Sequence, residues 1–81
     1  MTLTVLLFAR LRDVTGAAAV PVALPPGGTV ADLRRALAAA RPELAGLLAR
    51  SAVAVNHDFA DDARALAPGD EVAVIPPVSG G

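Results

Sequence analysis

The sequence predicts an α+β domain in which about five strands form a sheet and one main helix packs on one face. Short segments with an apolar residue at every second position, typical of strands, occur near both ends of the chain and in its middle. Only one long segment, which starts near Val30, has apolar residues at helical spacing. A chain of 81 residues with 54% hydrophobic residues forms one core, and one helix cannot cover both faces of the sheet. One face should therefore stay partly open.

The first half of the chain is expected to supply two strands with a short helix between them. Thr2–Phe8 alternates and becomes apolar on both faces towards its end, which predicts an interior strand. Ala9–Val14 could form a short helix that Gly16 ends with a C-terminal cap. Val20–Leu24 follows as a strand, and Pro21 places it at a sheet edge because proline donates no backbone hydrogen bond.

The main helix is expected to start at a capping box formed by Thr29 and Asp32 and to end before Pro42. The preceding Pro25–Gly28 segment is typical of a turn. Helical spacing places four residues on the core face, Val30, Leu33, Leu37 and Ala40. It places three on the outer face, Arg34, Arg35 and Ala38.

The second half is expected to add three strands. Glu43–Leu48 predicts a further helical turn or two, and Ala52–Asn56 a strand. His57 follows in a turn, because Asn, His and Asp tolerate positive φ. Phe59–Asp62 can form only a short strand, and Glu71–Ile75 is the last one.

The open face of the sheet is a candidate partner surface. Alternation in the last strand directs its two valines towards the core and leaves Ala73 and Ile75 on the open face. Phe8 and Phe59 could join them in an exposed apolar patch, which typically marks an interface. Parity alone leaves a second interpretation open, in which both phenylalanines belong to the core.

The residue inventory contains no constellation for independent catalysis. There are no cysteines and no lysines, and His57 is the only histidine, so thiolate chemistry, Schiff bases and a metal site are not expected. Gly27 and Gly28 before the main helix could hold an anion, although a plain turn is the simpler interpretation. The helix arginines, with Arg41, could form a docking patch or only a solvated helix face.

The charge distribution and hydropathy suggest which partners to expect. Residues 1–55 carry six Arg against three acids (+3), and residues 56–81 carry one Arg against five acids (−4). Because the acidic half holds the C-terminus, we expect a partner with a basic pocket and no binding of nucleic acid. No secretory signal or 18-residue apolar run is present, which predicts a cytoplasmic protein that does not bind membranes.

The end of the chain suggests a folded domain over residues 1–75 and a flexible diglycine arm over residues 76–81. Pro76 and Pro77 prevent the sheet from continuing and stiffen the start of the arm. Gly80 and Gly81 have no side chains to obstruct access to the terminal carboxylate. A frayed terminus would also end in this way, but the chain offers no other reactive group. The arrangement is typical of a domain that is modified at its C-terminus.

These residues resemble the MoaD family, the small sulfur-carrier subunits of molybdopterin synthase, within a ubiquitin-like group that includes ThiS and the ubiquitin-related modifiers. His57 departs from the glycine that often follows the asparagine in the family. The resemblance covers the whole chain and rests on Leu7-Phe8-Ala9, Arg12, Gly16, Ala54-Val55-Asn56, Leu66, Gly69-Asp70-Glu71-Val72 and Pro76-Pro77-Val78-Ser79-Gly80-Gly81.

The resemblance implies a β-grasp fold, a mixed sheet whose first and last strands pair in parallel at its centre. It implies that a MoeB-like enzyme, using ATP and Mg²⁺, adenylates Gly81 before the carboxylate becomes a thiocarboxylate. It also implies that the arm then enters a MoaE-like large subunit and donates sulfur to a cyclic pyranopterin precursor. A heterotetramer of two small and two large subunits is expected, with no cofactor bound by this chain. The expected partner contacts are Phe8, Phe59, Ile75, Pro76, Pro77, Val78 and Ser79, with Gly80 and Gly81 at the reacting end.

Two alternatives remain. One is a ubiquitin-like carrier that supplies sulfur to the thiazole of thiamine or to transfer RNA. The other is an interaction module whose C-terminus is never modified.

Overall fold

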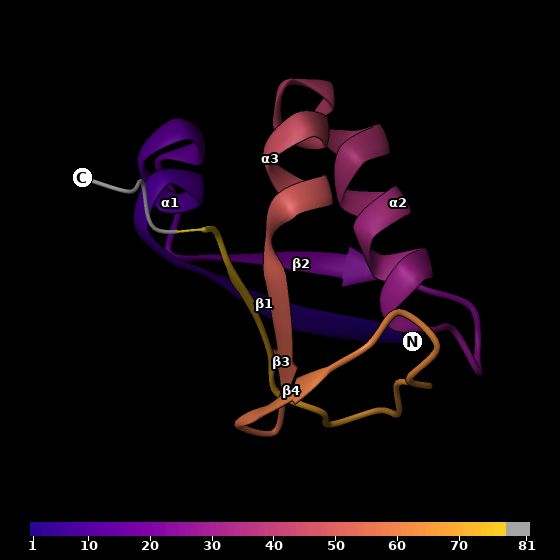
Figure 1. Ribbon diagram of the computed structural model, residues 1–81. Helices are drawn as coiled ribbons and strands as arrows, with labels where there is room; N and C mark the ends of the chain where they lie inside the picture. Colours follow the sequence, from indigo (N-terminus) through magenta and orange to yellow (C-terminus); the bar gives the residue numbers. More distant parts are fainter. Residues whose placement is uncertain (78–81) are drawn as a thin grey trace.

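The structure, a computed structural model, describes residues 1–77 and consists of a curved sheet with its helices on one side (Figure 1). The helices and strands are β1 (Thr2–Leu7), α1 (Ala9–Thr15), β2 (Ala19–Ala23), α2 (Val30–Ala40), the 3-10 turn η1 (Pro42–Leu44), α3 (Ala45–Arg50), β3 (Ala52–Val55), β4 (Asp58–Ala60) and β5 (Val72–Ile75). The predicted strands are thus present, and the helical segment after Pro42 is an ordered helix.

The five strands lie in the order β2-β1-β5-β3-β4, which places the last strand of the sequence at the centre of the sheet. β1 and β5 are parallel, with Leu7 paired to Val74, and the other neighbours are antiparallel. This is the mixed β-grasp sheet that was expected. β1 is an interior strand and β2 an edge strand, so both placements are confirmed.

Pro21 fits the edge strand because its missing N–H faces away from β1. Met1 and Leu24 exchange both backbone hydrogen bonds, at 2.6 and 2.8 Å. Antiparallel pairs alternate between bonded and non-bonded positions, so the Thr4–Pro21 pair falls at a non-bonded position. Pro21 therefore costs the sheet no hydrogen bond. On its outer edge, β2 has one backbone N–H fewer to offer to an added strand.

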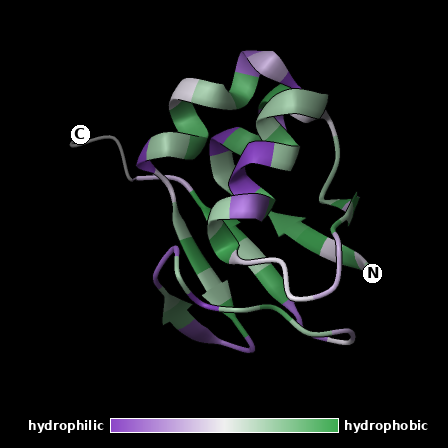
Figure 2. Cartoon of the chain, turned by 90° about the vertical axis from the view of Figure 1, so that its right-hand side faces the viewer, coloured by the Kyte–Doolittle hydropathy of each residue, from purple (hydrophilic) through white to green (hydrophobic). Residues whose placement is uncertain are grey.

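The core lies between the sheet and α2. Val30, Leu33 and Leu37 of α2 are buried, as predicted, and the capping box of Thr29 and Asp32 is present. Ala40 was expected in the core but is exposed, since it lines the open hollow between the end of α2 and β2. Figure 2 shows the strands mostly in hydrophobic colours, with the most hydrophilic segments on the helices and in turns.

Two residues expected on the outer face of α2 are partly covered because α3 packs beside that helix. Ala38 packs against the core. Arg34 keeps only 20% of its side chain exposed and donates hydrogen bonds to the Leu48 and Ser51 carbonyls at the end of α3. It also pairs with Asp62 at 2.8 Å. Arg34 is therefore a structural connector, and the prediction that it faces away was wrong.

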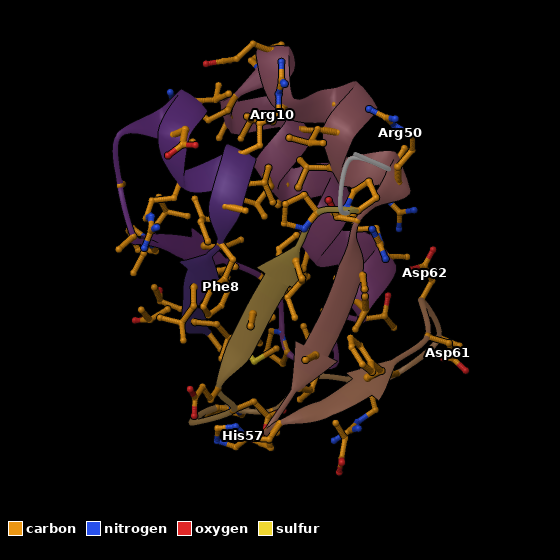
Figure 3. The ribbon with its side chains drawn as sticks, turned by 60° about the vertical axis from the view of Figure 1, so that its left-hand side comes forward. Phe8, Arg10, Arg50, His57, Asp61 and Asp62 are labelled. Carbon is orange, nitrogen blue, oxygen red and sulfur yellow. The ribbon has the colours of Figure 1, made fainter. Side chains whose placement is uncertain are left out.

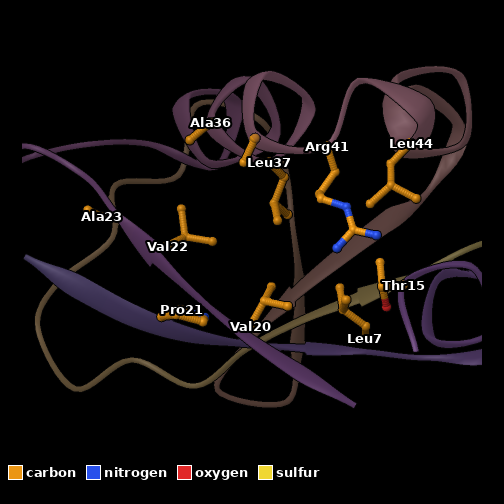
Figure 4. Close-up of a pocket in the computed structure, with 11 residues that line it drawn as sticks. Leu7, Thr15, Val20, Pro21, Val22, Ala23, Ala36, Leu37, Arg41 and Leu44 are labelled. Carbon is orange, nitrogen blue, oxygen red and sulfur yellow. The ribbon is translucent and has the colours of Figure 1, made fainter. Parts of the chain in front are cut away.

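The two layers do not close completely at the free edge. A hollow of about 280 Å³ lies between β2 and α2, with the Arg41 guanidinium directed into it (Figure 4). Arg41 also pairs with Glu43 at 3.0 Å.

Among the described residues, no helix is long and apolar enough to span a bilayer.

Candidate functional site

The face of the sheet opposite the helices is uncovered, as expected, and its middle is apolar. Strand register places Leu6, Ala73, Ala54 and Phe59 in one row across four strands. Ile75 lies on the same face because it pairs with Ala52. A shallow hollow of about 260 Å³ is formed by Leu6, Phe8, Ala54, His57, Phe59, Glu71, Ala73 and Ile75.

Both phenylalanines lie on this open face and not in the core. Phe59 is 76% exposed and Phe8 is 43% exposed, while the two valines of β5 are fully buried. Phe59 is the more exposed because β4 is an edge strand whose single neighbour, β3, offers only the small Ala54 opposite it. Ile75 is half-buried. We call Phe8, Phe59 and Ile75 the apolar patch.

The β3–β4 turn forms one border of the hollow. Its two central residues, Asn56 and His57, have φ of 51° and 72°, as a two-residue hairpin turn of type I′ requires. His57 is 83% exposed at its side chain, and its Nε2 atom lies 3.2 Å from a Glu71 carboxylate oxygen. The turn role expected for His57 is thus confirmed.

Asn56 holds this turn against the start of the central strand. Its side-chain oxygen accepts a hydrogen bond from the Glu71 N–H at 2.9 Å, and its amide donates to the Asp70 carboxylate at 3.0 Å. Asp70 also accepts from the Ala67 N–H at 2.8 Å. That backbone bond, followed by the bond from Asn56, lowers the pKa of Asp70 below its ordinary value of 3.8. The network fixes where β5 begins.

The arm leaves the sheet from the far end of β5. Pro76 is buried, so it belongs to the folded body and offers little surface to a partner, whereas Pro77 is exposed. The remaining residues for which a role was expected lie outside the described part of the chain: Val78, Ser79, Gly80 and Gly81. The arm therefore starts from β5, a strand that is paired on both sides.

The charges around the arm differ from what the two halves of the sequence suggested. Figure 3 shows Arg10 and Arg50 at the end of the sheet where the arm leaves, with His57, Asp61 and Asp62 towards the opposite end. The surroundings of the arm are thus basic, although the C-terminal segment itself belongs to the acidic half. Charge summed along the sequence does not reveal this, because Arg10 and Arg50 are forty residues apart and come to the same end of the molecule only in the fold.

The described residues contain no cluster of three or more His, Asp or Glu that could hold a metal ion. The titratable groups with shifted pKa values, Asp32, Glu43 and Asp70, are all solvent-accessible carboxylates. In each, the largest cause of the lower pKa is a hydrogen bond with a backbone group. The described hollow is therefore lined mainly by apolar side chains, with the exposed His57–Glu71 pair at its border.

Sequence reasoning did not identify the Asn56 network or the two arginines beside the arm. The sequence did contain an indication for Asn56, since an asparagine in a turn with positive φ often also forms hydrogen bonds with neighbouring backbone groups. No local pattern could have indicated the arginines.

The sheet order and the helices on one face define a ubiquitin-like β-grasp domain, and comparison with known proteins gives its family. Residues 5–81 match the ThiS family model. The chain is 39% identical over 83 residues to the molybdopterin synthase sulfur carrier subunit of Chlamydomonas reinhardtii, with full coverage of both chains. It is 34% identical over 80 residues to the human protein of that name, covering 95% of this chain and 91% of the relative.

Solved structures agree with this assignment. The crystal structure of the small archaeal modifier protein 1 (SAMP1) of Haloferax volcanii superposes with a TM-score of 0.87 at 35% identity over the full length of both chains. A putative molybdopterin converting factor subunit 1 of Pyrococcus furiosus gives a TM-score of 0.85 at 28% identity, covering 96% of this chain and 99% of that one. The chain belongs to the ThiS family, in the group that includes MoaD.

Proposed function

We propose that this chain is the sulfur-carrier subunit of a molybdopterin synthase. The observation that carries the proposal is full-length similarity to proteins with that name, at 34–39% identity, together with a Pro-Pro-Val-Ser-Gly-Gly end that follows the central strand. The apolar patch supports it, because a carrier must be recognised by a partner before its arm can be used.

The chemistry begins at the Gly81 carboxylate. A carboxylate is a poor acyl donor because its leaving group would be an oxide ion. One of its oxygens attacks the α-phosphorus of ATP, pyrophosphate leaves, and an acyl adenylate forms. A MoeB-like enzyme supplies the ATP, the Mg²⁺ and the basic groups for this step. Sulfur at the sulfide level then attacks the carbonyl carbon, AMP leaves, and the product is a thiocarboxylate.

Delivery of the sulfur takes place in a second complex. The arm enters a MoaE-like large subunit, where the thiocarboxylate sulfur attacks a carbon of the cyclic pyranopterin precursor and displaces an oxygen substituent. Water then cleaves the acyl–sulfur bond, which leaves the sulfur on the pterin and regenerates the Gly81 carboxylate. A dithiolene contains two sulfurs, so two carriers are consumed for each product molecule. A complex of subunits 1 and 2 of the molybdopterin-converting factor from Helicobacter pylori contains a similarly folded chain, with a TM-score of 0.71. This supports a large-subunit partner for the present chain.

Mass spectrometry of the intact protein tests the first half of the proposal. The chain is incubated with its adenylating enzyme, ATP and a sulfur source, and the expected result is the mass increase for replacing one oxygen by sulfur. A variant without Gly81 should keep its circular dichroism spectrum and show no increase. An unmodified wild-type chain would instead support the plain interaction module.

Affinity capture from an extract of the same organism tests the second half. Recovery of a MoaE-like subunit supports the proposal. Recovery of a thiazole synthase or a transfer-RNA thiolation enzyme in its place would favour the alternative that the carrier supplies another thiolation reaction.

A further inference from the structure

The strand register places two arginines beside the point where the arm leaves the fold. β1 pairs with β5 up to Leu7 and Val74, and Arg10 follows three residues after Leu7. On the other side Ala52 pairs with Ile75, and Arg50 lies two residues before Ala52. One arginine therefore stands on each side of the strand that continues into Pro77. Figure 3 shows both side chains at this end of the molecule.

These two arginines differ from those of α2 and the turn that follows it. Arg34, Arg35 and Arg41 all form ion pairs with neighbouring carboxylates. Arg10 and Arg50 are exposed, and among residues 1–77 neither has an ion-pair partner. Two unpaired positive charges at one end of an apolar patch are available to another molecule.

The opposite end of the open face is acidic. Glu71 precedes β5, and Asp61 lies just beyond β4. Both are exposed, and Glu71 has only His57 as an ion-pair partner among the described residues. The apolar patch therefore lies between a basic end at the arm and an acidic end at the β3–β4 turn. Such a polarity favours one orientation of a docking partner.

We propose that Arg10 and Arg50, the arginine pair, bind carboxylates at the entrance of the channel that receives the arm in the molybdopterin synthase large subunit. The inference rests on the proposed function, which requires an arm that enters such a channel. Beyond the proposed function, it assigns carboxylates to the entrance of the channel. It also gives Arg10 and Arg50 a role in docking, at a distance from the reacting atoms. Their effect is on the rate and direction of encounter.

A carboxylate-bearing protein fits this surface better than a phosphate backbone does. Nucleic-acid sites need a stripe of positive charge, and here the two arginines lie only at one end of the molecule, with His57 and Asp61 towards the other. A protein partner can cover the patch with apolar side chains and place acidic residues at its border, as protein interfaces commonly do.

The test measures association of the full chain with the purified large subunit from the same organism by stopped-flow fluorescence. The double variant Arg10→Gln/Arg50→Gln is compared with Arg64→Gln, an exposed arginine whose backbone binds the start of α2 at the other end of the sheet. Each arginine of the pair should account for roughly two- to fivefold in the association rate. The difference should grow at about 10 mM salt, where the screening length is roughly 30 Å, and shrink at about 1 M salt.

Three results overturn the inference while leaving the proposed function intact: the double variant associates as fast as the Arg64→Gln control, it associates faster than wild type, or its deficit is independent of salt. Thermal melting at the wild-type temperature shows that the variant is folded. Sulfur transfer from preformed thiocarboxylate at saturating large subunit should be unchanged. If the wild-type chain does not bind the large subunit at all, the proposed function fails, and this inference fails with it.

Discussion

Phe59 gives the sharpest test of the apolar patch because most of its side chain is outside the fold. It is 76% exposed on an edge strand, so about a quarter of the side chain is buried by folding. Full burial of a phenylalanine stabilises by about 1.5–3 kcal/mol, so Phe59→Ala should cost the fold about 0.4–0.7 kcal/mol. If a partner covers the rest, binding should weaken by about 1.1–2.3 kcal/mol, or roughly 6- to 45-fold in Kd.

Phe8→Ala should show the opposite balance. At 43% exposure, more than half of the ring is buried by folding, which predicts about 0.9–1.7 kcal/mol lost in stability and roughly a 3- to 8-fold loss in affinity. Stability is measured by urea unfolding, and affinity for the large subunit by isothermal titration calorimetry. Val14→Ala is the control, because Val14 is 45% exposed on α1 and does not line the hollow.

The assignment of the apolar patch is refuted if Phe59→Ala lowers stability more than Phe8→Ala does, since the exposed fraction would then fail to predict which residue contributes more to stability. It is also refuted if Phe59→Ala leaves the affinity at the level of the Val14→Ala control, because the most exposed apolar side chain would then lie outside the interface.

Three further changes test the network and the helix contacts described above. Asn56→Ala removes two side-chain hydrogen bonds and places alanine at a φ of 51°, so urea unfolding should show a loss of about 2–3 kcal/mol, part of which Asn56→Gly restores. Arg34→Gln should cost about 2–4 kcal/mol in the same assay, and Arg34→Lys should recover only part, because one ammonium cannot replace the planar fork that binds two carbonyls and Asp62. The pKa of Asp70 is lowered in the folded state, so its contribution to stability is present above its ordinary value of 3.8 and is lost as the pH falls through the folded value. Unfolding between pH 2 and 5 should therefore show a shallower acid dependence for Asp70→Asn than for wild type, and an unchanged slope would contradict the assignment.

The elements could be predicted from the sequence wherever local chemistry determines them. Apolar alternation identified the strands, and Thr29 with Asp32 identified the start of α2, because both signals arise within a few residues. The proline at position 21 located an edge by the donor that it lacks. These predictions needed no knowledge of which strands are neighbours.

The predictions that failed depend on contacts between distant segments. Arg34 has the spacing of an outward residue, and only the packing of α3 beside α2 gives it the Leu48 and Ser51 carbonyls as partners. Ala40 has core spacing but is exposed, because the helix and the sheet leave a hollow between them there. The exposure of Phe59 follows from the place of β4 at the edge, which the residue pattern alone left open.

The topology also bears on how the proposed carrier would offer its arm to a partner. The arm continues from β5, the central strand, which is paired on both sides and holds the fully buried Val72 and Val74. A segment attached at the centre of a sheet is tied to its most protected part, whereas one attached to β2 or β4 would pull on an edge that opens more easily. Under the proposed function, a pull on the arm would therefore act on the most protected strand of the sheet. Because the apolar patch and the arginine pair lie beside the same strand, docking of that face also sets the point from which the arm starts.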